Sequence, residues 1–269
     1  MSLRINTNVE AFNAHRQLVG TSDKLGKAME RLSSGYRINR AADDAAGLAI
    51  TEKLRGQITG LEQAQRNGQD AISLVQTAEG SLTEVHAMLQ RVRELAVQYK
   101  NGSLSASDRL AIQSEVNMLA SEVERIGSTA QFNGIQLLNV QQTISFQVGA
   151  MDGEVINVST ISLGAGVPPA VYALTATGSS DISEIDTAID AISAQRAQFG
   201  AVQNRLDHTL ANLAVYQENL QASESRIRDV DMAAEMVNFT KLQILQQSGT
   251  AMLAQANQLP QSVLQLLQG

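Results

Sequence analysis

The chain has 269 residues, a formal net charge of −7, and neither cysteine nor tryptophan. The length allows one or two domains, and the negative charge argues against nucleic acid as the main ligand. The lack of cysteine excludes disulfides, thiol catalysis and thiolate metal sites. Because aromatic residues make up only 3% of the chain, the core must be aliphatic, which suits long packed helices.

Residues 1–44 are predicted to form an N-terminal helical segment, in which residues 1–42 carry seven basic and three acidic side chains. No apolar run of roughly 7–15 residues occurs in residues 1–20, which argues against a cleaved secretory signal. An adjacent acid pair such as Asp43 and Asp44 can share a proton in catalysis. Their position before an apolar run favours a helix cap instead.

Residues 45–139 are predicted to form two helices joined by a turn at Asn101-Gly102-Ser103. Apolar residues recur in steps of four and three, which indicates a seam of packed helices. The first seam comprises positions 54, 58, 61, 65, 68, 72, 75, 79, 82, 86, 89, 93 and 96, of which eight are apolar. The second runs from Ile112 to Ile126, and Ser105 or Ser107 is expected to cap its helix.

Residues 140–180 differ in kind. Apolar and polar residues alternate from Ile144 to Val148 and again from Val155 to Val158, on either side of a turn at Met151-Asp152-Gly153. This pattern predicts a β-hairpin, followed by a loop rich in glycine, proline and serine.

Residues 181–228 return as a long helix, and residues 229–269 form a C-terminal helical segment. The return helix has nine apolar residues at the thirteen positions 185, 189, 192, 196, 199, 203, 206, 210, 213, 217, 220, 224 and 227. The C-terminal segment holds eight glutamines between Gln243 and Gln268 but few charges. Amides can hydrogen-bond in an interface without the desolvation penalty of a charge, so this segment suits contact with other copies. We expect both end segments to lack caps.

No catalytic or metal-binding pattern is evident. His15, His86 and His208 are far apart, and neither a His-Glu-x-x-His zinc motif, a phosphate-binding Walker loop nor a Gly-x-Ser-x-Gly elbow occurs. We therefore expect no enzyme activity, no cofactor and no metal.

The fold class predicted is mainly α: a long antiparallel helical rod or coiled coil with a small β-hairpin region at its distal end. The two termini are expected to meet at the other end. A self-assembling structural protein fits this pattern best. A cytosolic coiled-coil signalling or adaptor protein would explain the seams but not the amide-rich end.

Several motifs resemble those of bacterial flagellins. Residues 32–50 (LSSGYRINRAADDAAGLAI) resemble the N-terminal signature of that family. Residues 131–134 (QFNG), followed by Leu137 and Leu138, are similar to its turn before the β region. Residues 229–235 (DVDMAAE) and 255–261 (QANQLPQ) resemble its C-terminal signature. This chain is identified as a short member that lacks large outer domains.

The resemblance implies a secreted subunit that polymerises with itself into the extracellular flagellar filament for motility. It also implies unfolded export by the flagellar type III apparatus, and filament cap, hook-junction and export-chaperone proteins as partners. No nucleic acid and no membrane insertion are expected. In such a subunit, residues 1–44 and 229–269 pair as an inner core, and residues 45–139 and 181–228 form an outer core. A hook–filament junction protein, which resembles flagellin at both ends, is the alternative.

Two groups of contact residues follow from the resemblance. Residues 90–98 look like the stretch bound by the vertebrate Toll-like receptor for flagellin, which assigns contacts to Arg91, Leu95 and Glu115. Leu95 also falls on a second stripe with Glu84, Met88, Arg91 and Gln98, so we expect it off the core face, where it could equally contact another subunit. An export chaperone is expected to cover an apolar C-terminal face, which comprises Leu242, Leu245, Met252 and Leu253.

Overall fold

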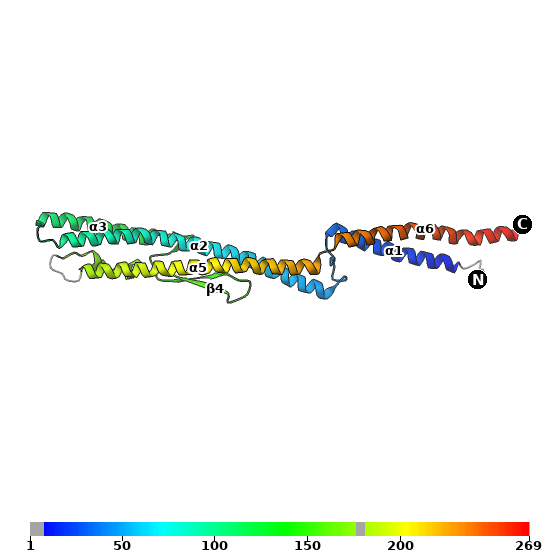
Figure 1. The fold of residues 1–269 in the computed structure, drawn as a ribbon, viewed down its shortest axis with the longest axis horizontal. Coiled ribbons are helices and arrows are strands. Elements are labelled where there is room, and N and C mark those ends of the chain that lie inside the picture. Colours follow the sequence, from blue (N-terminus) through cyan, green and yellow to red (C-terminus); the bar gives the residue numbers. More distant parts are fainter. Residues whose placement is uncertain (1–7, 176–180, 269) are drawn as a thin grey trace. The chain divides into compact units, whose positions relative to one another are not determined.

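The computed structural model of the chain describes residues 8–175 and 181–268, and it is mainly helical (Figure 1). The long helices are α1 (Val9–Ser34), α2 (Ala45–Tyr99), α3 (Ala106–Thr129), α5 (Asp181–Arg228) and α6 (Met232–Gln268). Short elements are β1 (Gln131–Phe132), β2 (Ile135–Gln136), β3 (Thr143–Gln147), β4 (Val155–Ser159), α4 (Leu163–Gly166) and a 3-10 turn, η1 (Pro169–Tyr172). The predicted class, mainly α with a small β region, is confirmed. The predicted segments 1–44, 140–180 and 229–269 each extend in part outside the described residues.

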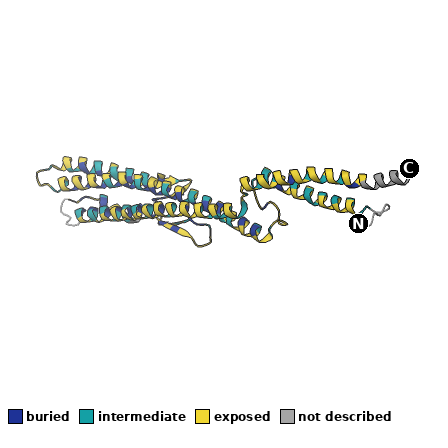
Figure 2. Cartoon of the chain, turned by 45° about the vertical axis from the view of Figure 1, so that its right-hand side comes forward, coloured by how far each residue is buried: buried dark blue, intermediate teal, exposed yellow. Residues whose placement is uncertain are grey.

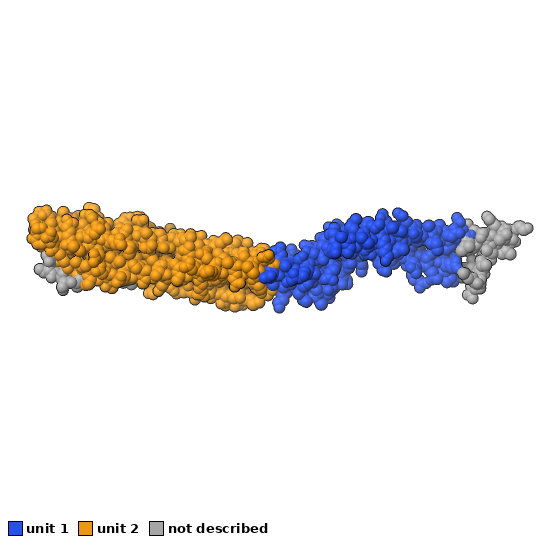
Figure 3. Space-filling model, in the orientation of Figure 1, with its two compact units in different colours: residues 1–56, 219–269 blue, residues 57–218 orange. Residues whose placement is uncertain are grey.

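The chain forms two compact units, one of residues 57–218 and one of residues 1–56 and 219–269 (Figure 3). Helices α2 and α5 each contribute to both units. Within residues 57–218 these two helices run antiparallel, because Gln65 bonds to Gln217 whereas Arg93 pairs with Asp186 near the start of α5.

The α2 side of the core in residues 57–218 is a continuous seven-residue repeat. Its buried positions are Leu61, Ala64, Gly68, Ala71, Val75, Ala78, Leu82, Val85, Leu89, Val92 and Ala96. The prediction had every other position of this seam right, at 61, 68, 75, 82, 89 and 96. It placed the positions between them one residue too late, because its steps followed Leu54, Ile58 and Leu61 at the start of the helix, where Ile58 is itself buried. Small residues bring the helices close together, and a methyl group added at Gly68 would lie 2.8 Å from Leu210 Cδ2.

Helix α5 shows the same one-residue correction. Ile185, Ile192, Phe199, Leu206 and Leu213 are buried as predicted. The intervening buried positions in the first half of α5 are Ala188 and Gln195 rather than 189 and 196.

Helix α3 completes this core as the sequence predicts, and the β region packs against it. Ile112, Val116 and Val123 are buried, and Ser105 forms a capping box with Asp108.

Strands β3 and β4 form the predicted antiparallel hairpin. The β3–β4 hairpin does not lie at the distal end as predicted: Asn67 Nδ2 donates to the carbonyl oxygen of Gln147 at 3.0 Å, far along α2 from its end at Tyr99. A second, minimal hairpin of β1 and β2 turns at Asn133 and Gly134, whose φ angles are 48° and 79°. Consecutive positive φ angles suit a tight hairpin turn.

In the other unit, α1 and α6 lie side by side and antiparallel. Asn8 Nδ2 donates to the carbonyl oxygen of Ala256 at 2.7 Å near one end, and Val230 N donates to that of Gly35 at 3.0 Å near the other. The facing positions again follow steps of three and four. They are Ala11, Ala14, Leu18, Thr21, Leu25, Ala28 and Leu32 on α1, and Glu235, Phe239, Leu242, Gln246, Gly249, Leu253 and Ala256 on α6.

The expectation that the end segments lack caps is wrong. Asn8 accepts a hydrogen bond from Ala11 N at 3.0 Å, Asp231 accepts from Ala233 N at 3.0 Å, and Gly35 ends α1 in the left-handed conformation. Each satisfies backbone groups that a helix end leaves open. No helix in the described ranges combines the length and the apolar character that crossing a bilayer requires.

Candidate functional site

The α1–α6 pair leaves most of its apolar side chains uncovered. In the part of α1 and α6 whose side chains are described, only Ala28, Leu242 and Ala256 are buried. Phe12 and Val237, in contrast, are 67% and 72% exposed. Figure 2 shows exposed positions along most of α1 and α6, whereas buried ones recur along the helices of residues 57–218. A pair of helices that buries so little gains little to offset the entropy of ordering it, so it needs further contacts.

A groove of about 600 Å³ lies between α1 and α6. Its apolar lining is Ala14, Leu18, Leu245, Gly249, Met252 and Ala256, and its polar lining is Glu10, Asn13, Gln17, Thr21, Ser248 and Gln255. A methyl group added at Gly249 would lie 3.2 Å from Leu18 Cδ1, so the glycine lets the two helices approach closely. An apolar strip between polar margins resembles the core and rim of a protein interface.

The four residues predicted to form one C-terminal apolar face lie on two faces. Leu242 is buried and Leu253 is half-buried, both in the seam against α1. Leu245 and Met252 are 47% and 65% exposed and line the groove. The prediction grouped them because one helix was considered alone, without the helix that covers part of it.

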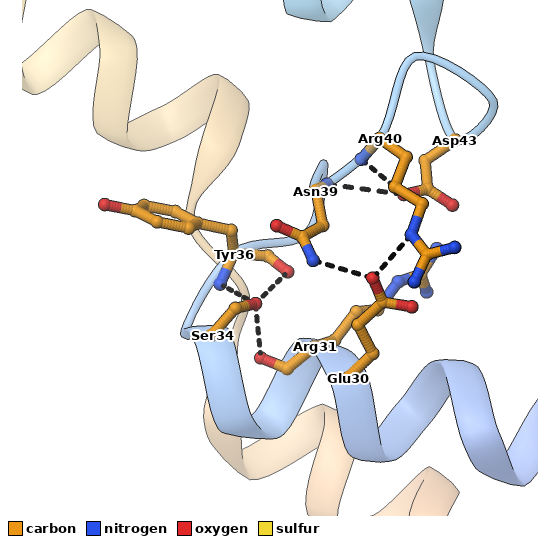
Figure 4. A network of polar contacts seen from close by, with 7 residues as sticks. All are labelled: Glu30, Arg31, Ser34, Tyr36, Asn39, Arg40 and Asp43. Carbon is orange, nitrogen blue, oxygen red and sulfur yellow. Dashed lines mark hydrogen bonds and ion pairs between the residues drawn. The ribbon is translucent and has the colours of Figure 1, made fainter.

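The loop from Gly35 to Asp44 is held by a polar network (Figure 4). Glu30 Oε1 accepts from Asn39 Nδ2 at 2.7 Å and from Arg40 Nε at 2.8 Å. The carboxylate of Asp43 accepts from the backbone N–H groups of Arg40 and Asn39, and the Arg40 bond is the main cause that lowers the pKa of Asp43. Asp44 accepts from Gly47 N at 2.8 Å and caps α2. The capping role predicted for the acid pair is confirmed for Asp44, while Asp43 ties the loop together.

Arg228, at the end of α5, contacts both this loop and α2, and no sequence motif marks it beyond its place before residues 229–235. Its guanidinium lies 4.7 Å from the centre of the Tyr36 ring, and Nη1 lies 3.0 Å from Glu52 Oε1. Arg37 donates from its backbone N to the carbonyl oxygen of Arg228 at 2.6 Å. The loop and the end of α5 therefore hold each other in place.

Arg91 and Glu115 meet on the surface, but Leu95 does not join them. Arg91 Nη2 lies 2.9 Å from Glu115 Oε1, and Nη1 lies 3.0 Å from Glu94 Oε2. The hydrogen bond to Glu115 is the main cause that raises the pKa of Arg91. Leu95 is only 2% exposed and belongs to the hydrophobic core.

The expectation that Leu95 lies off the core face is therefore wrong. Helix α2 packs against α3 as well as α5, so a wider arc of α2 is covered than one seam predicts. Met88, on the same predicted stripe, is also packed against the core. In residues 8–175 and 181–268, no three His, Asp or Glu side chains gather as metal ligands would.

Long antiparallel helices, of which the terminal pair leaves most of its apolar side chains exposed, define a structural protein that associates with other copies. The family model for the bacterial flagellin N-terminal helical region matches residues 5–143, and the model for the C-terminal helical region matches residues 182–267. The chain therefore belongs to the bacterial flagellin family. It is a structural subunit of the flagellar filament, which lies outside the cell.

Relatives match over nearly the whole chain. Flagellin from Halalkalibacterium halodurans is 53% identical over 272 residues, covering 98% of this chain and 99% of the relative. Flagellin from Bacillus subtilis is 48% identical over 303 residues, covering 98% and 100%. The crystal structure of Bacillus cereus flagellin is 33% identical with a TM-score of 0.51, and the match covers 55% of this chain and 88% of that one.

Proposed function

We propose that α1 and α6 drive polymerisation, while residues 45–139 and 181–228 form the outer part of each subunit. In this division residues 1–44 and 229–269 are the inner-core segments. Residues 140–180 are the small β-hairpin and loop region in the middle of the chain. The observation that carries the proposal is the contrast in burial between the α1–α6 pair and residues 57–218. The protein then serves as a building element and not as an enzyme.

Removal of both end segments tests this division. A fragment of residues 45–228 is expected to remain helical and monomeric, because the seams from Leu61 to Ala96 and from Ile185 to Leu213 stay intact. The full chain is expected to form filaments when seeded. Circular dichroism, sedimentation and electron microscopy separate the two outcomes, and long filaments from the fragment would contradict the proposal.

We propose that the subunit leaves the cell unfolded through the flagellar type III apparatus. The absence of cysteine supports this, since no disulfide can lock the chain before transit. Deletion of the first ~25 residues is expected to keep the protein inside the cell. Normal secretion of that deletion variant would contradict the proposal.

An export chaperone is proposed to cover Leu242, Leu245, Met252 and Leu253 before transit. Because Leu242 and Leu253 lie against α1 in the folded subunit, the chaperone binds only a chain whose α1–α6 pair is open. Hook-junction and filament cap proteins are the further partners proposed, at the two ends of the filament.

We propose that the vertebrate Toll-like receptor for flagellin contacts the exposed pair Arg91 and Glu115, with Leu95 holding α2 in place from beneath. The pair is solvent-exposed and joins α2 to α3. Arg91→Ala with Glu115→Ala is expected to abolish receptor activation without changing helicity. The matched control is Arg93→Ala, which removes an exposed ion pair to Asp186 on α5 instead. An undiminished response from the folded double variant would remove this assignment.

A further inference from the structure

The α1–α6 pair carries a groove on one side of α1 and two exposed apolar residues on the other. Ala14, Gln17 and Thr21 line the groove. Phe12 and Val19, which are both exposed, lie about half a turn around α1 from them at 3.6 residues per turn. One copy therefore carries the groove on one side of α1 and the exposed Phe12 and Val19 side chains on the opposite side.

The two surfaces also match in spacing. Phe12 and Val19 are seven residues apart, as are Leu245 and Met252, so each pair spans about 10.5 Å along its helix at about 1.5 Å per residue. Both projecting side chains can therefore meet both groove side chains in one contact. Phenylalanine and methionine are both enriched in protein interfaces, and Phe12 and Met252 are both exposed in the single subunit.

We propose that Phe12 and Val19 of one copy of this chain insert into the α1–α6 groove of a neighbouring copy, against Leu245 and Met252. The proposal rests on the function proposed above, and it names which face of the terminal pair meets which. The contact is head-to-tail: each copy gives its Phe12 face to one neighbour and its groove to another. When the rotation that relates one copy to the next does not close a ring, a head-to-tail contact builds an open helical filament that can keep growing.

The lining of the groove fits this occupant better than a charged or strongly polar one. Its apolar lining consists of alanine, leucine and methionine side chains beside Gly249, and its polar lining consists of amide and hydroxyl groups and one carboxylate, that of Glu10. The polar lining can hydrogen-bond across an interface, while the apolar lining gains only from apolar burial.

Disulfide trapping tests the contact, because the chain has no cysteine of its own. Phe12→Cys is combined in turn with Leu245→Cys and with Met252→Cys, and assembled filaments are treated with a mild oxidant. Since a disulfide requires Cα atoms about 4.4–6.8 Å apart, at least one double variant is expected to give a ladder of covalent multimers. The matched control is Phe12→Cys with Gln247→Cys, because Gln247 is exposed on α6 but does not line the groove.

The control pair and each single variant are expected to give no ladder. Absence of multimers from both groove variants in intact filaments would overturn the proposal. Covalent dimers from Phe12→Cys alone would overturn its head-to-tail geometry. Failure of the unaltered chain to form filaments would instead overturn the proposed function, and this pairing with it.

A thermodynamic cycle decides the question if the cysteine variants do not assemble. Phe12→Ala and Met252→Ala are each expected to raise the critical concentration for polymerisation about tenfold, and the double variant little further, because either change removes the same contact. Phe12→Ala with Val237→Ala serves as the control, and their effects are expected to multiply. Multiplied effects for Phe12 and Met252 would overturn the pairing.

Discussion

Replacement of Leu95 by alanine is expected to destabilise the subunit, although the flagellin resemblance assigns this residue to a surface contact. Leu95 is 2% exposed and packs in the main core. The change removes three buried carbons, which at about 0.8 kcal/mol each gives about 2.4 kcal/mol. The cavity left behind adds to this, so the expected loss in free energy of unfolding is about 3–5 kcal/mol.

Urea denaturation of the unassembled full chain, followed by circular dichroism, measures the loss. With a urea dependence of about 1–3 kcal/mol/M, the midpoint is expected to fall by about 1 M or more. The matched control is Val97→Ala, two residues further along α2 and 52% exposed, which is expected to change the free energy by less than about 0.5 kcal/mol.

Equal midpoints for Leu95→Ala and Val97→Ala would refute the assignment of Leu95 to the core. The result also decides how a receptor experiment is read. A Leu95 variant that fails to activate the receptor does not show contact, because the surface above it has lost its support. Arg91 and Glu115 are therefore the residues to change.

Four further changes test the fold. Ser105→Ala is expected to lower stability by about 1 kcal/mol in urea denaturation because it removes a helix cap, whereas Ser121→Ala within α3 changes it little. The hydrogen bonds from Ser105 lower the pKa of Asp108, so this stabilisation is present at neutral pH and is lost as acid protonates Asp108. A loss of stability in Ser105→Ala that is the same at neutral and acid pH would contradict this. Burial raises the pKa of Tyr172 to about 12. As the pH rises, the unfolded chain loses the Tyr172 proton before the folded chain does, so stability is expected to fall between pH 10 and pH 12. Tyr172→Phe is expected to reduce that fall. Gly80→Ala, which meets nothing within 4 Å, is expected to raise the melting temperature, and Gly68→Leu, which meets Leu210, to lower it.

The period of the helices could be predicted from the sequence, but the choice of buried face could only partly be predicted. Both alternations of three and four pass through Leu61, Val75 and Leu89, so these positions were right under either choice. Between them the true seam holds Ala64, Ala71, Ala78, Val85 and Val92, whereas the predicted seam holds Gln65, Ile72, Glu79, His86 and Arg93. The predicted alternation follows Leu54, Ile58 and Leu61 at the start of the helix, and only at Ile72 does the wrong neighbour carry an apolar side chain.

The candidate site was harder to predict, because its geometry depends on pairs of helices. The pairing of Arg91 with Glu115 followed from the family resemblance, whereas the burial of Leu95 depends on α3 lying beside α2. The contact between the Tyr36 ring and the Arg228 guanidinium connects residues almost two hundred positions apart, and no local sequence pattern predicts such a contact.

The division of α6 into two faces connects the proposed export with the proposed assembly. Leu242 and Leu253 are covered by α1 in the folded subunit, whereas Leu245 and Met252 are open in the groove. A chaperone that covers all four therefore blocks two events together: α1 cannot pair with α6, and Phe12 of another copy cannot enter the groove. Polymerisation inside the cell is then prevented by the same contact that keeps the end segments open for transit. Coverage of Leu245 and Met252 alone would suffice to block assembly. A chaperone therefore needs to cover Leu242 and Leu253 as well only if the chain must leave the cell unfolded.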